Sequence, residues 1–201
     1  MSIGKRKYQQ FCGVARALDV LGERWTLLIV RNLLLGPRRY GTLLDELPGL
    51  TTNLLAKRLH ALLGHQLVEK VDTRDASLWG LTDAGRALEP VIMELGRFGG
   101  RYLDNPKRGD RFDLGWALLS LKRRYRPSSL EGRLIAIEAG ARHFELQGQG
   151  TYLSVQERPC PTAEIRVRGE PGAIVAWLFA DSEVGVEVEG AAKAMVRNAF
   201  G

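Results

Sequence analysis

One stretch of the chain carries polar side chains that could read DNA bases from one face of a helix. Thr52, Asn53 and Lys57 lie in the run 52–63, and four of its five leucines, at positions 55, 59, 62 and 63, fall largely on the opposite face. From the major groove, an asparagine amide can bond adenine through two hydrogen bonds, and a lysine can reach guanine. Thr51 precedes the run and is a good N-cap residue. The pattern predicts a DNA-reading helix that begins after Thr51.

The segments around this run have the order of a winged helix-turn-helix. Gly22, then Gly36-Pro37, then Pro48-Gly49 end three predicted helices ahead of it. An alternating hairpin with a polar turn follows, and Thr82 caps a final helix. The expected helices are 13–22, 23–35, 39–47, 52–63 and 82–103, and the expected strands are 67–71 and 78–81.

Further polar residues of this half could contact the DNA backbone. The start of the third helix combines cations with free backbone N–H groups, which favours a phosphate. The hairpin tip could lie along the backbone or enter the minor groove. The alternative is that these side chains form an ordinary solvated helix face. The predicted DNA-contact set is Arg38, Arg39, Tyr40, Thr51, Thr52, Asn53, Lys57, Arg58, His60 and Arg74.

Composition and charge fit a globular protein with an anionic partner. The 201 residues are 45% apolar and 26% charged, and 29 Lys and Arg against 23 Asp and Glu give a net charge of +6. No apolar run reaches the roughly 18 residues of a membrane span. The first ten residues are polar, unlike a signal peptide. We expect a cytoplasmic protein with no membrane partner.

The residues that could do covalent or metal chemistry are few. The two cysteines, Cys12 and Cys160, are far apart, and no Cys/His spacing suggests zinc. A catalytic Cys160 would need His143 as a base, and Pro159 and Pro161 more simply indicate a turn. No nucleotide-binding or hydrolase motif occurs. We predict no enzyme activity, no metal and no cofactor.

The second half of the chain changes from helical to strand periodicity. A linker, 104–110, separates a domain of residues 1–104 from one of residues 105–201. An amphipathic helix over 114–125 is followed by alternating segments, and Gly148 and Gly150 suggest a tight hairpin. We expect an α+β domain. Its strands are 133–138, 143–147, 151–156, 163–168 and 184–188, and its later helices are 171–180 and 191–200.

Residues 11–103 resemble the HxlR-type winged-helix regulators, a bacterial group related in fold to MarR. The resemblance implies a transcriptional regulator, more often a repressor, that binds operator DNA as a homodimer. The first and last helices of this half would form the dimer. It places the recognition helix at 51–63. The matching text is Cys12, Leu18-Asp19-Val20-Leu21-Gly22, Arg24-Trp25-Thr26, Leu35-Gly36-Pro37-Arg38-Arg39-Tyr40, Leu47-Pro48-Gly49-Leu50, Leu55, Lys57-Arg58-Leu59, Leu67-Val68 and Leu81-Thr82-Asp83-Ala84-Gly85-Arg86-Ala87-Leu88.

Two features of this half leave alternatives open. The wing is shorter than in the family, and Trp79 stands near the family's Tyr, so phosphate contact by Arg74 is favoured over minor-groove reading. Relatives carry an N-terminal Cys that senses oxidants or electrophiles, and Cys12 has basic residues nearby in sequence. Burial is the usual fate of a free cysteine, and we favour it for Cys12. The redox alternative is a regulator switched by Cys12 with a purely structural second half.

The second half resembles the sterol-carrier-protein-type (SCP2-like) domains. Matching text includes Leu130-Glu131-Gly132-Arg133-Leu134, Tyr152-Leu153-Ser154-Val155 and Val186-Glu187-Val188-Glu189-Gly190. The resemblance implies an apolar tunnel between sheet and helices for a hydrophobic small molecule, or a lipid-carrier-like protein. The alternative is that the candidate lining forms an ordinary core. Those candidates are Trp116, Leu119, Phe144, Tyr152, Trp177, Leu178 and Phe200.

Overall fold

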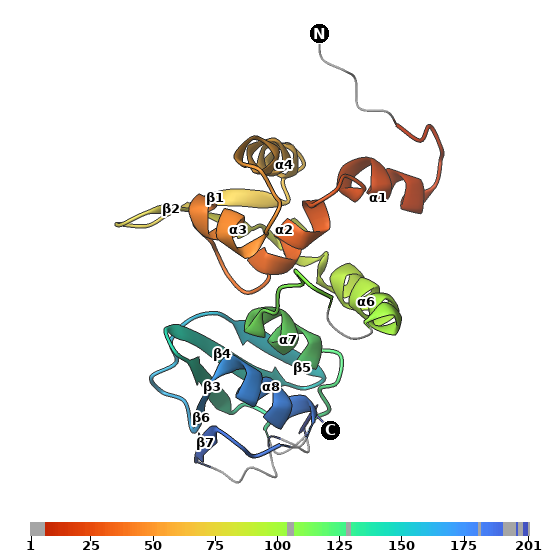
Figure 1. Ribbon diagram of the computed structural model, residues 1–201. Coiled ribbons are helices and arrows are strands. Elements are labelled where there is room, and N and C mark those ends of the chain that lie inside the picture. Colours follow the sequence, from red (N-terminus) through yellow and green to blue (C-terminus); the bar gives the residue numbers. More distant parts are fainter. Residues whose placement is uncertain are drawn as a thin grey trace. The chain divides into compact units, whose positions relative to one another are not determined.

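The computed structural model describes residues 7–103, 107–127, 130–180, 182–190, 196 and 199–200 (Figure 1). The chain divides into two compact units, Met1–Ile92 and Met93–Gly201. The start of the expected linker and most of the expected helix 191–200 lie outside the described residues. The domain boundary at residue 104 stays a prediction. Within the described parts, no helix is both long and apolar enough to cross a membrane.

The first unit has the predicted order of helices followed by a hairpin. The buried leucines of α2, α3 and α4 form its core together with Val68 and Leu81. The hairpin strands pair antiparallel, with Val68 opposite Leu81 and Asp72 opposite Ser77. The elements are α1 (Gly13–Leu21), α2 (Thr26–Leu33), α3 (Tyr40–Glu46), α4 (Thr52–Gly64), β1 (Val68–Asp72), β2 (Ser77–Leu81) and α5 (Asp83–Arg86).

Two predicted helices differ from the structure. The second begins at Thr26 instead of residue 23, because Trp25 has a left-handed φ of 79° that a helix cannot contain. The long helix after Thr82 is broken into α5 and α6 (Glu89–Gly99), followed by a 3-10 turn, η1 (Gly100–Tyr102). Pro90 explains the break, since its ring would clash with the carbonyl of Arg86 in a continuous helix. Thr82 caps only the short α5, and its hydroxyl accepts from the Gly85 N–H at 3.1 Å.

The second unit contains a five-stranded mixed sheet in the order β5-β4-β3-β6-β7. The central strands β3 and β6 run parallel, and the other neighbours are antiparallel. Helices α7 and α8 cover one face of this sheet (Figure 1). The elements are α7 (Leu114–Leu121), β3 (Leu134–Ala139), β4 (Arg142–Gln149), β5 (Tyr152–Gln156), β6 (Ile165–Gly169), α8 (Pro171–Phe179) and β7 (Val186–Glu189).

Alternation along the strands separates a buried face from an open one. Side chains such as Ile137, Phe144 and Val167 are at most 1% exposed and face the helices. Helix α7 ends at Leu121, earlier than the expected residue 125. The predicted tight hairpin is confirmed, because Gly150 has a φ of 55° in the turn between β4 and β5.

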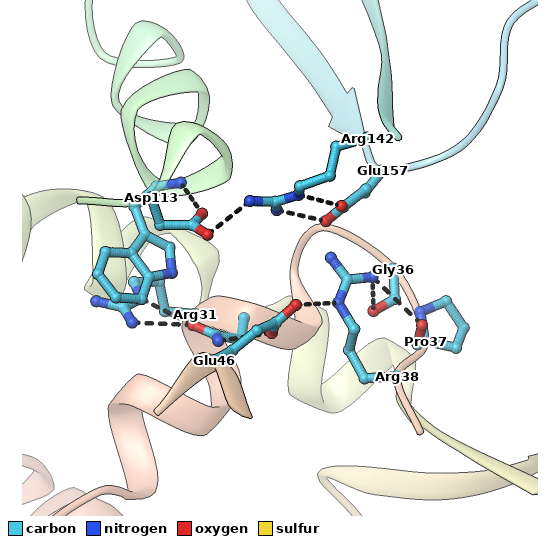
Figure 2. A network of polar contacts seen from close by, with 10 residues as sticks. Arg31, Gly36, Pro37, Arg38, Glu46, Asp113, Arg142 and Glu157 are labelled. Carbon is cyan, nitrogen blue, oxygen red and sulfur yellow. Dashed lines mark hydrogen bonds and ion pairs between the residues drawn. The ribbon is translucent and has the colours of Figure 1, made fainter. Parts of the chain in front are cut away.

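A partly buried ion-pair cluster holds the start of α7 to the sheet. The Asp113 carboxylate accepts from the Trp116 N–H at 3.2 Å, which caps α7. Its other oxygen accepts from Arg142 Nη1 at 2.6 Å, and Arg142 also makes two hydrogen bonds to Glu157 (Figure 2). The fork geometry of the guanidinium therefore fixes α7 against β4 and the residues after β5.

Candidate nucleic-acid interface

Helix α4 presents the predicted reading residues to solvent. Thr51 is its N-cap, and the Thr51 hydroxyl accepts from the Leu54 N–H at 3.4 Å. The leucines on the inner face are at most 1% exposed, at positions 55, 59 and 62. Thr52, Asn53 and Lys57 are exposed, as is His60. The fold thus buries one side of the helix and leaves the predicted reading side open.

Arg58 lies on the inner side of α4 and ties that helix to the start of α2. Its Nε donates to the Arg24 carbonyl at 2.9 Å, and its Nη2 donates to Glu23 at 2.6 Å. The Arg58 side chain is 9% exposed and that of Glu23 is 50% exposed. These bonds occupy the guanidinium within the fold, so we leave Arg58 out of the proposed contact surface. Its place three residues after Leu55 and four before Leu62 already indicated the inner face.

Helix α3 is joined to the first turn of α4 through Tyr40. The Tyr40 hydroxyl donates to the Thr52 carbonyl at 2.6 Å. Arg39, the residue before α3, is exposed. Tyr40 therefore ties α3 to the first turn of α4, and the Arg39 side chain is accessible to solvent.

The Arg38 side chain is held in a polar network that joins α2, α3 and the loop between them (Figure 2). Arg31 donates twice to the Asn32 amide oxygen, at 3.0 and 2.9 Å. Asn32 donates to Glu46 at 2.8 Å, and Glu46 accepts from Arg38 Nε at 3.2 Å. Asn32 is 1% and Arg38 is 7% exposed. Because Arg38 is buried and paired, we also remove it from the proposed contact surface; sequence reasoning missed this network.

The wing is a short hairpin anchored to the loop before α3. Arg38 and Trp79 exchange two backbone hydrogen bonds, at 2.9 and 2.8 Å, which add a third strand-like segment beside β2. Lys70 lies 4.0 Å above the centre of the Trp79 ring. At the tip, Thr73 bonds Ala76 through its backbone and its hydroxyl, and Arg74 is exposed. The tip is therefore a defined turn that carries an accessible cation.

Cys12 is exposed, so the expectation that it is buried is wrong. It occupies the N-cap position of α1. The backbone N–H groups of Ala15 and Val14 lower the pKa of the Cys12 thiol, because they stabilise its negative charge. The other cysteine, Cys160, is buried. Burial raises the pKa of the Cys160 thiol, and Glu145 raises it further.

Two helices carry apolar side chains that are exposed in the single chain. Phe11, Val14 and Leu18 lie at helical spacing at and before α1. Val91, Leu95, Phe98 and Tyr102 have the same spacing along α6 and η1. Spacing of three and four residues places Val14 and Leu18 on one side of α1, and Val91, Leu95 and Phe98 on one side of α6; Phe11 lies just before α1. Each helix therefore offers an apolar stripe.

The residues expected to line a tunnel in the second unit fall into three groups. Leu119, Phe144, Trp177 and Phe200 are at most 2% exposed and form the core between sheet and helices. Trp116 and Leu178 are partly exposed. Tyr152 is 48% exposed and its hydroxyl accepts from Lys122 Nζ at 3.1 Å. Tyr152 therefore lies at the surface, and the prediction that it lines a tunnel is wrong.

Within the described chain, no group of three His, Cys, Asp or Glu residues is arranged to hold a metal ion.

A helix-turn-helix followed by a wing, with an exposed polar helix face, defines a class of transcriptional regulators. Residues 20–107 match the HxlR-like helix-turn-helix family. A helix-turn-helix transcriptional regulator of Synechocystis is 32% identical over 96 residues, which are 46% of this chain and 71% of the relative. One of Mycobacterium tuberculosis is 39% identical over 97 residues, 47% of this chain and 61% of the relative. The chain belongs to the HxlR-like family.

Bacillus subtilis YodB, also named a helix-turn-helix transcriptional regulator, is 33% identical over 82 residues, 39% of this chain and 73% of YodB. The crystal structure of quinone-bound YodB aligns with a TM-score of 0.40 and 30% identity, over 44% of this chain and 96% of that one. The family match ends at residue 107, so most of the second unit lies outside it.

Proposed function

We propose that this regulator binds double-stranded operator DNA as a homodimer, with α4 in the major groove, and acts as a repressor. The observation that carries the proposal is the solvent-facing set of Thr52, Asn53 and Lys57 on a helix whose other side is buried. Asn53 and Lys57 have base-reading chemistry, and residues in the first turns of a recognition helix reach base edges.

The remaining contacts in the proposal are to the phosphate backbone. Arg39, Thr51, His60 and Arg74 are exposed around α4 and the wing. Such contacts fix the register of a protein on the duplex without reading sequence. Tyr40 contributes through its bond to the Thr52 carbonyl.

The apolar stripes of α1 and α6 support a second copy of this chain as the partner. An apolar stripe that a single chain leaves in water is typical of an interface. A two-fold dimer would present two α4 helices to successive half-sites of a pseudo-palindromic operator. Replacing Leu95 with Asp should then produce monomers in sedimentation analysis, whereas exchanging exposed Gln149 for Asp should not.

For the second unit, we propose an SCP2-like domain that binds a hydrophobic small molecule between sheet and helices. The mixed sheet with both helices on one face supports it, and a ligand would displace or contact the core side chains Phe144, Trp177 and Phe200. A ligand would alter operator affinity only by binding the DNA-competent and incompetent states differently. The exposed Cys12 with its lowered pKa favours a second candidate function, control by oxidants or electrophiles.

Occupancy of promoters in cells tests the DNA proposal. Thr52, Asn53 and Lys57 are replaced together by Ala, and occupancy is measured by chromatin precipitation. We expect its loss, because these positions carry the proposed base contacts. A matched triple exchange of exposed Lys107, Gln149 and Thr151 for Ala serves as control. Unaltered occupancy in the α4 variant, with wild-type protein levels, would overturn the proposal.

A further inference from the structure

We propose that the second unit contacts the phosphate backbone of the DNA that flanks the operator, through a patch of arginines where α6 and α7 end. The proposal rests on the DNA binding proposed above and adds a second contact surface to it. We call this surface the arginine patch. Four of its side chains are exposed and that of Arg123 is partly exposed. Its members are Arg97, Arg101, Arg123, Arg124 and Arg126.

Positive charge in the second unit is concentrated in one segment of the chain. Residues 97–126 contain nine Lys and Arg and three Asp, whereas residues 127–201 contain seven Lys and Arg and ten Asp and Glu. Strand carboxylates such as Glu138, Glu145 and Glu189 lie on the sheet face that α7 and α8 leave open. The basic segment includes α7, which covers the other face, so the unit has separate basic and acidic regions.

Folding brings Arg123, just after α7, against the last turn of α6. A Cβ atom at Gly96 would clash with the Arg123 guanidinium, so this side chain lies against the α6 backbone. Burial lowers the pKa of Arg123, and the charge of Arg97 lowers it further, although Glu94 acts in the opposite direction. Arg101 follows Arg97 by one helical turn. The fold therefore holds like charges close together, and an external anion would relieve their repulsion.

Arg124 and Arg126 extend the patch beyond the end of α7. The central guanidinium carbon of Arg124 lies 5.2 Å from the centre of the Phe179 ring. The backbone N–H of Arg126 donates to the Ala199 carbonyl at 3.0 Å, and the Arg126 side chain is exposed. In the part of the chain that the structure describes, no carboxylate forms an ion pair with Arg124 or Arg126. Both guanidinium groups are therefore available to an anionic partner.

The alternative is that these arginines only complement the carboxyl ends of helices. Each such end carries about half a negative charge, so the ends of α6, α7 and α8 together offset between about one and two of the five positive charges. Glu94 pairs with Arg97 at 3.3 Å, but both side chains are about two-thirds exposed, and a phosphate can replace so weak a partner. Glu131, near Tyr125, also opposes an anion. Positive charge remains in excess, which favours a polyanion as the partner.

Duplex DNA is the polyanion that this chain offers to the patch. The chain belongs to a family of helix-turn-helix regulators, and an operator held by the first unit would bring flanking DNA to a high effective concentration at the attached second unit. A guanidinium can bind a phosphate through two hydrogen bonds, and a duplex presents phosphates along its whole length. Such contacts carry no sequence information. The patch should therefore raise affinity for longer duplexes whatever the sequence of their flanks.

Fluorescence anisotropy of the full chain on two duplexes tests the proposal. Both contain an operator selected from a random pool, and one continues on each side for roughly 15 bp, about one and a half helical turns, of unrelated sequence. We expect the wild type to bind the longer duplex at least about tenfold more tightly, the effect of about 1.4 kcal/mol. Arg124→Gln combined with Arg126→Gln should remove most of this gain. The matched pair Arg133→Gln and Arg158→Gln, which removes the same charge elsewhere in the unit, should retain it.

The salt dependence on the longer duplex gives a second readout. The slope of log affinity against log salt should fall by about 0.9 for each lost phosphate contact, hence by roughly 3 to 4 for two arginines on each of two protomers. Circular dichroism verifies the fold, and Arg101→Gln alone carries the test if the double variant does not fold. Equal affinity of the wild type for both duplexes overturns the patch. So does an arginine variant that retains the wild-type gain and slope.

The triple α4 variant separates this proposal from the proposed reading by α4. That variant should lose its preference for the operator over unrelated duplexes but keep weak binding to long DNA. Adding Arg124→Gln and Arg126→Gln to it should weaken this residual binding by about tenfold. Failure of the α4 proposal would leave the operator preference intact in the α4 variant, whereas failure of the patch would leave the dependence on duplex length intact in the arginine variant.

Discussion

The hydroxyl of Tyr40 donates a 2.6 Å hydrogen bond to the carbonyl oxygen of Thr52. It joins the first residue of α3 to the first residue of α4, and Thr52 is itself a proposed base contact. Arg58 makes a second connection from α4, to the backbone of Arg24 and the carboxylate of Glu23. Helix α4, the proposed reading helix, is therefore held at its first turn and at its middle by side chains that need not contact DNA.

Tyr40→Phe should weaken operator binding without unfolding the protein. One hydrogen bond contributes about 0.5–1.5 kcal/mol, so we expect a loss of roughly two- to tenfold in affinity if the bond orients α4. Fluorescence anisotropy with a duplex selected from a random pool measures it. Tyr152→Phe removes a hydroxyl from the surface of the second unit and should have no effect. Equal affinity of both variants would show that the bond does not position the helix.

Arg58→Met should destabilise the first unit. The substitution keeps much of the side-chain volume but leaves the Arg24 carbonyl without its bond, and a loss of about 1–3 kcal/mol in the free energy of unfolding is expected. Urea denaturation followed by circular dichroism measures it. Arg97→Met is the control, since the Arg97–Glu94 pair is 65% and 64% exposed and should contribute less than about 1 kcal/mol. A similar small change in both variants would contradict the internal role of Arg58.

Local patterns predicted the elements better than they predicted the contacts. The cap at Thr51 and the leucine spacing predicted α4, because both signals lie within one or two helical turns. The positive charge of Arg58 suggested a contact with DNA, although its spacing from Leu55 and Leu62 placed it on the buried side of α4. The bond between Asn32 and Glu46 joins residues 14 apart in the chain, and no local rule indicates it.

The ion pair between Glu138 and Arg168 shows the same limit at longer range. Period-two alternation indicated that one side of each strand would be exposed. Glu138 meets Arg168 only because β3 pairs parallel with β6, 30 residues away. Sequence periodicity does not predict which strands pair, so it could not indicate the contact between β3 and β6. The same holds for Cys160 and His143, which the fold brings to one hollow.

The two cysteines should differ in reactivity. Cys12 is exposed and its thiol pKa is lowered by the Ala15 and Val14 N–H groups, whereas the pKa of Cys160 is raised by burial and by Glu145. Because the thiolate is the nucleophile, iodoacetamide near neutral pH should label Cys12 well before Cys160. Peptide mass spectrometry over time measures both rates in one sample. Cys12→Ser should remove the fast phase, and equal rates in the folded chain would contradict the assignment.

Glu138 should contribute stability that acid removes. Burial disfavours its charge, but the hydrogen bonds from Arg168 and Arg166 outweigh burial and hold the pKa of Glu138 below its ordinary 4.5. A carboxyl group with a lowered folded-state pKa stabilises the fold above its unfolded pKa and loses that contribution as the pH falls through the folded value.

Thermal unfolding between about pH 6 and about pH 2.5 should therefore show a shallower acid decline in Glu138→Gln than in the wild type. The substitution should also lower stability at pH 6, where the wild-type carboxylate is ionised and paired. Glu94→Gln, which removes a carboxylate from an exposed pair, should retain the wild-type decline. A Glu138→Gln curve parallel to the wild type would mean that its ion pairs do not stabilise the fold.

Arg74→Ala distinguishes a phosphate contact from base reading by the wing. The exposed Arg74 lies in a tip held by the Thr73–Ala76 bonds, so its removal should leave the hairpin intact. A phosphate contact releases condensed counterions, and its loss should reduce the slope of log affinity against log salt by about 1 for each Arg74, hence about 2 for a dimer. Affinity should fall by a similar factor on selected and unrelated duplexes. Arg133→Ala, in the second unit, should leave the slope unchanged, and an unchanged slope in Arg74→Ala would exclude the phosphate contact.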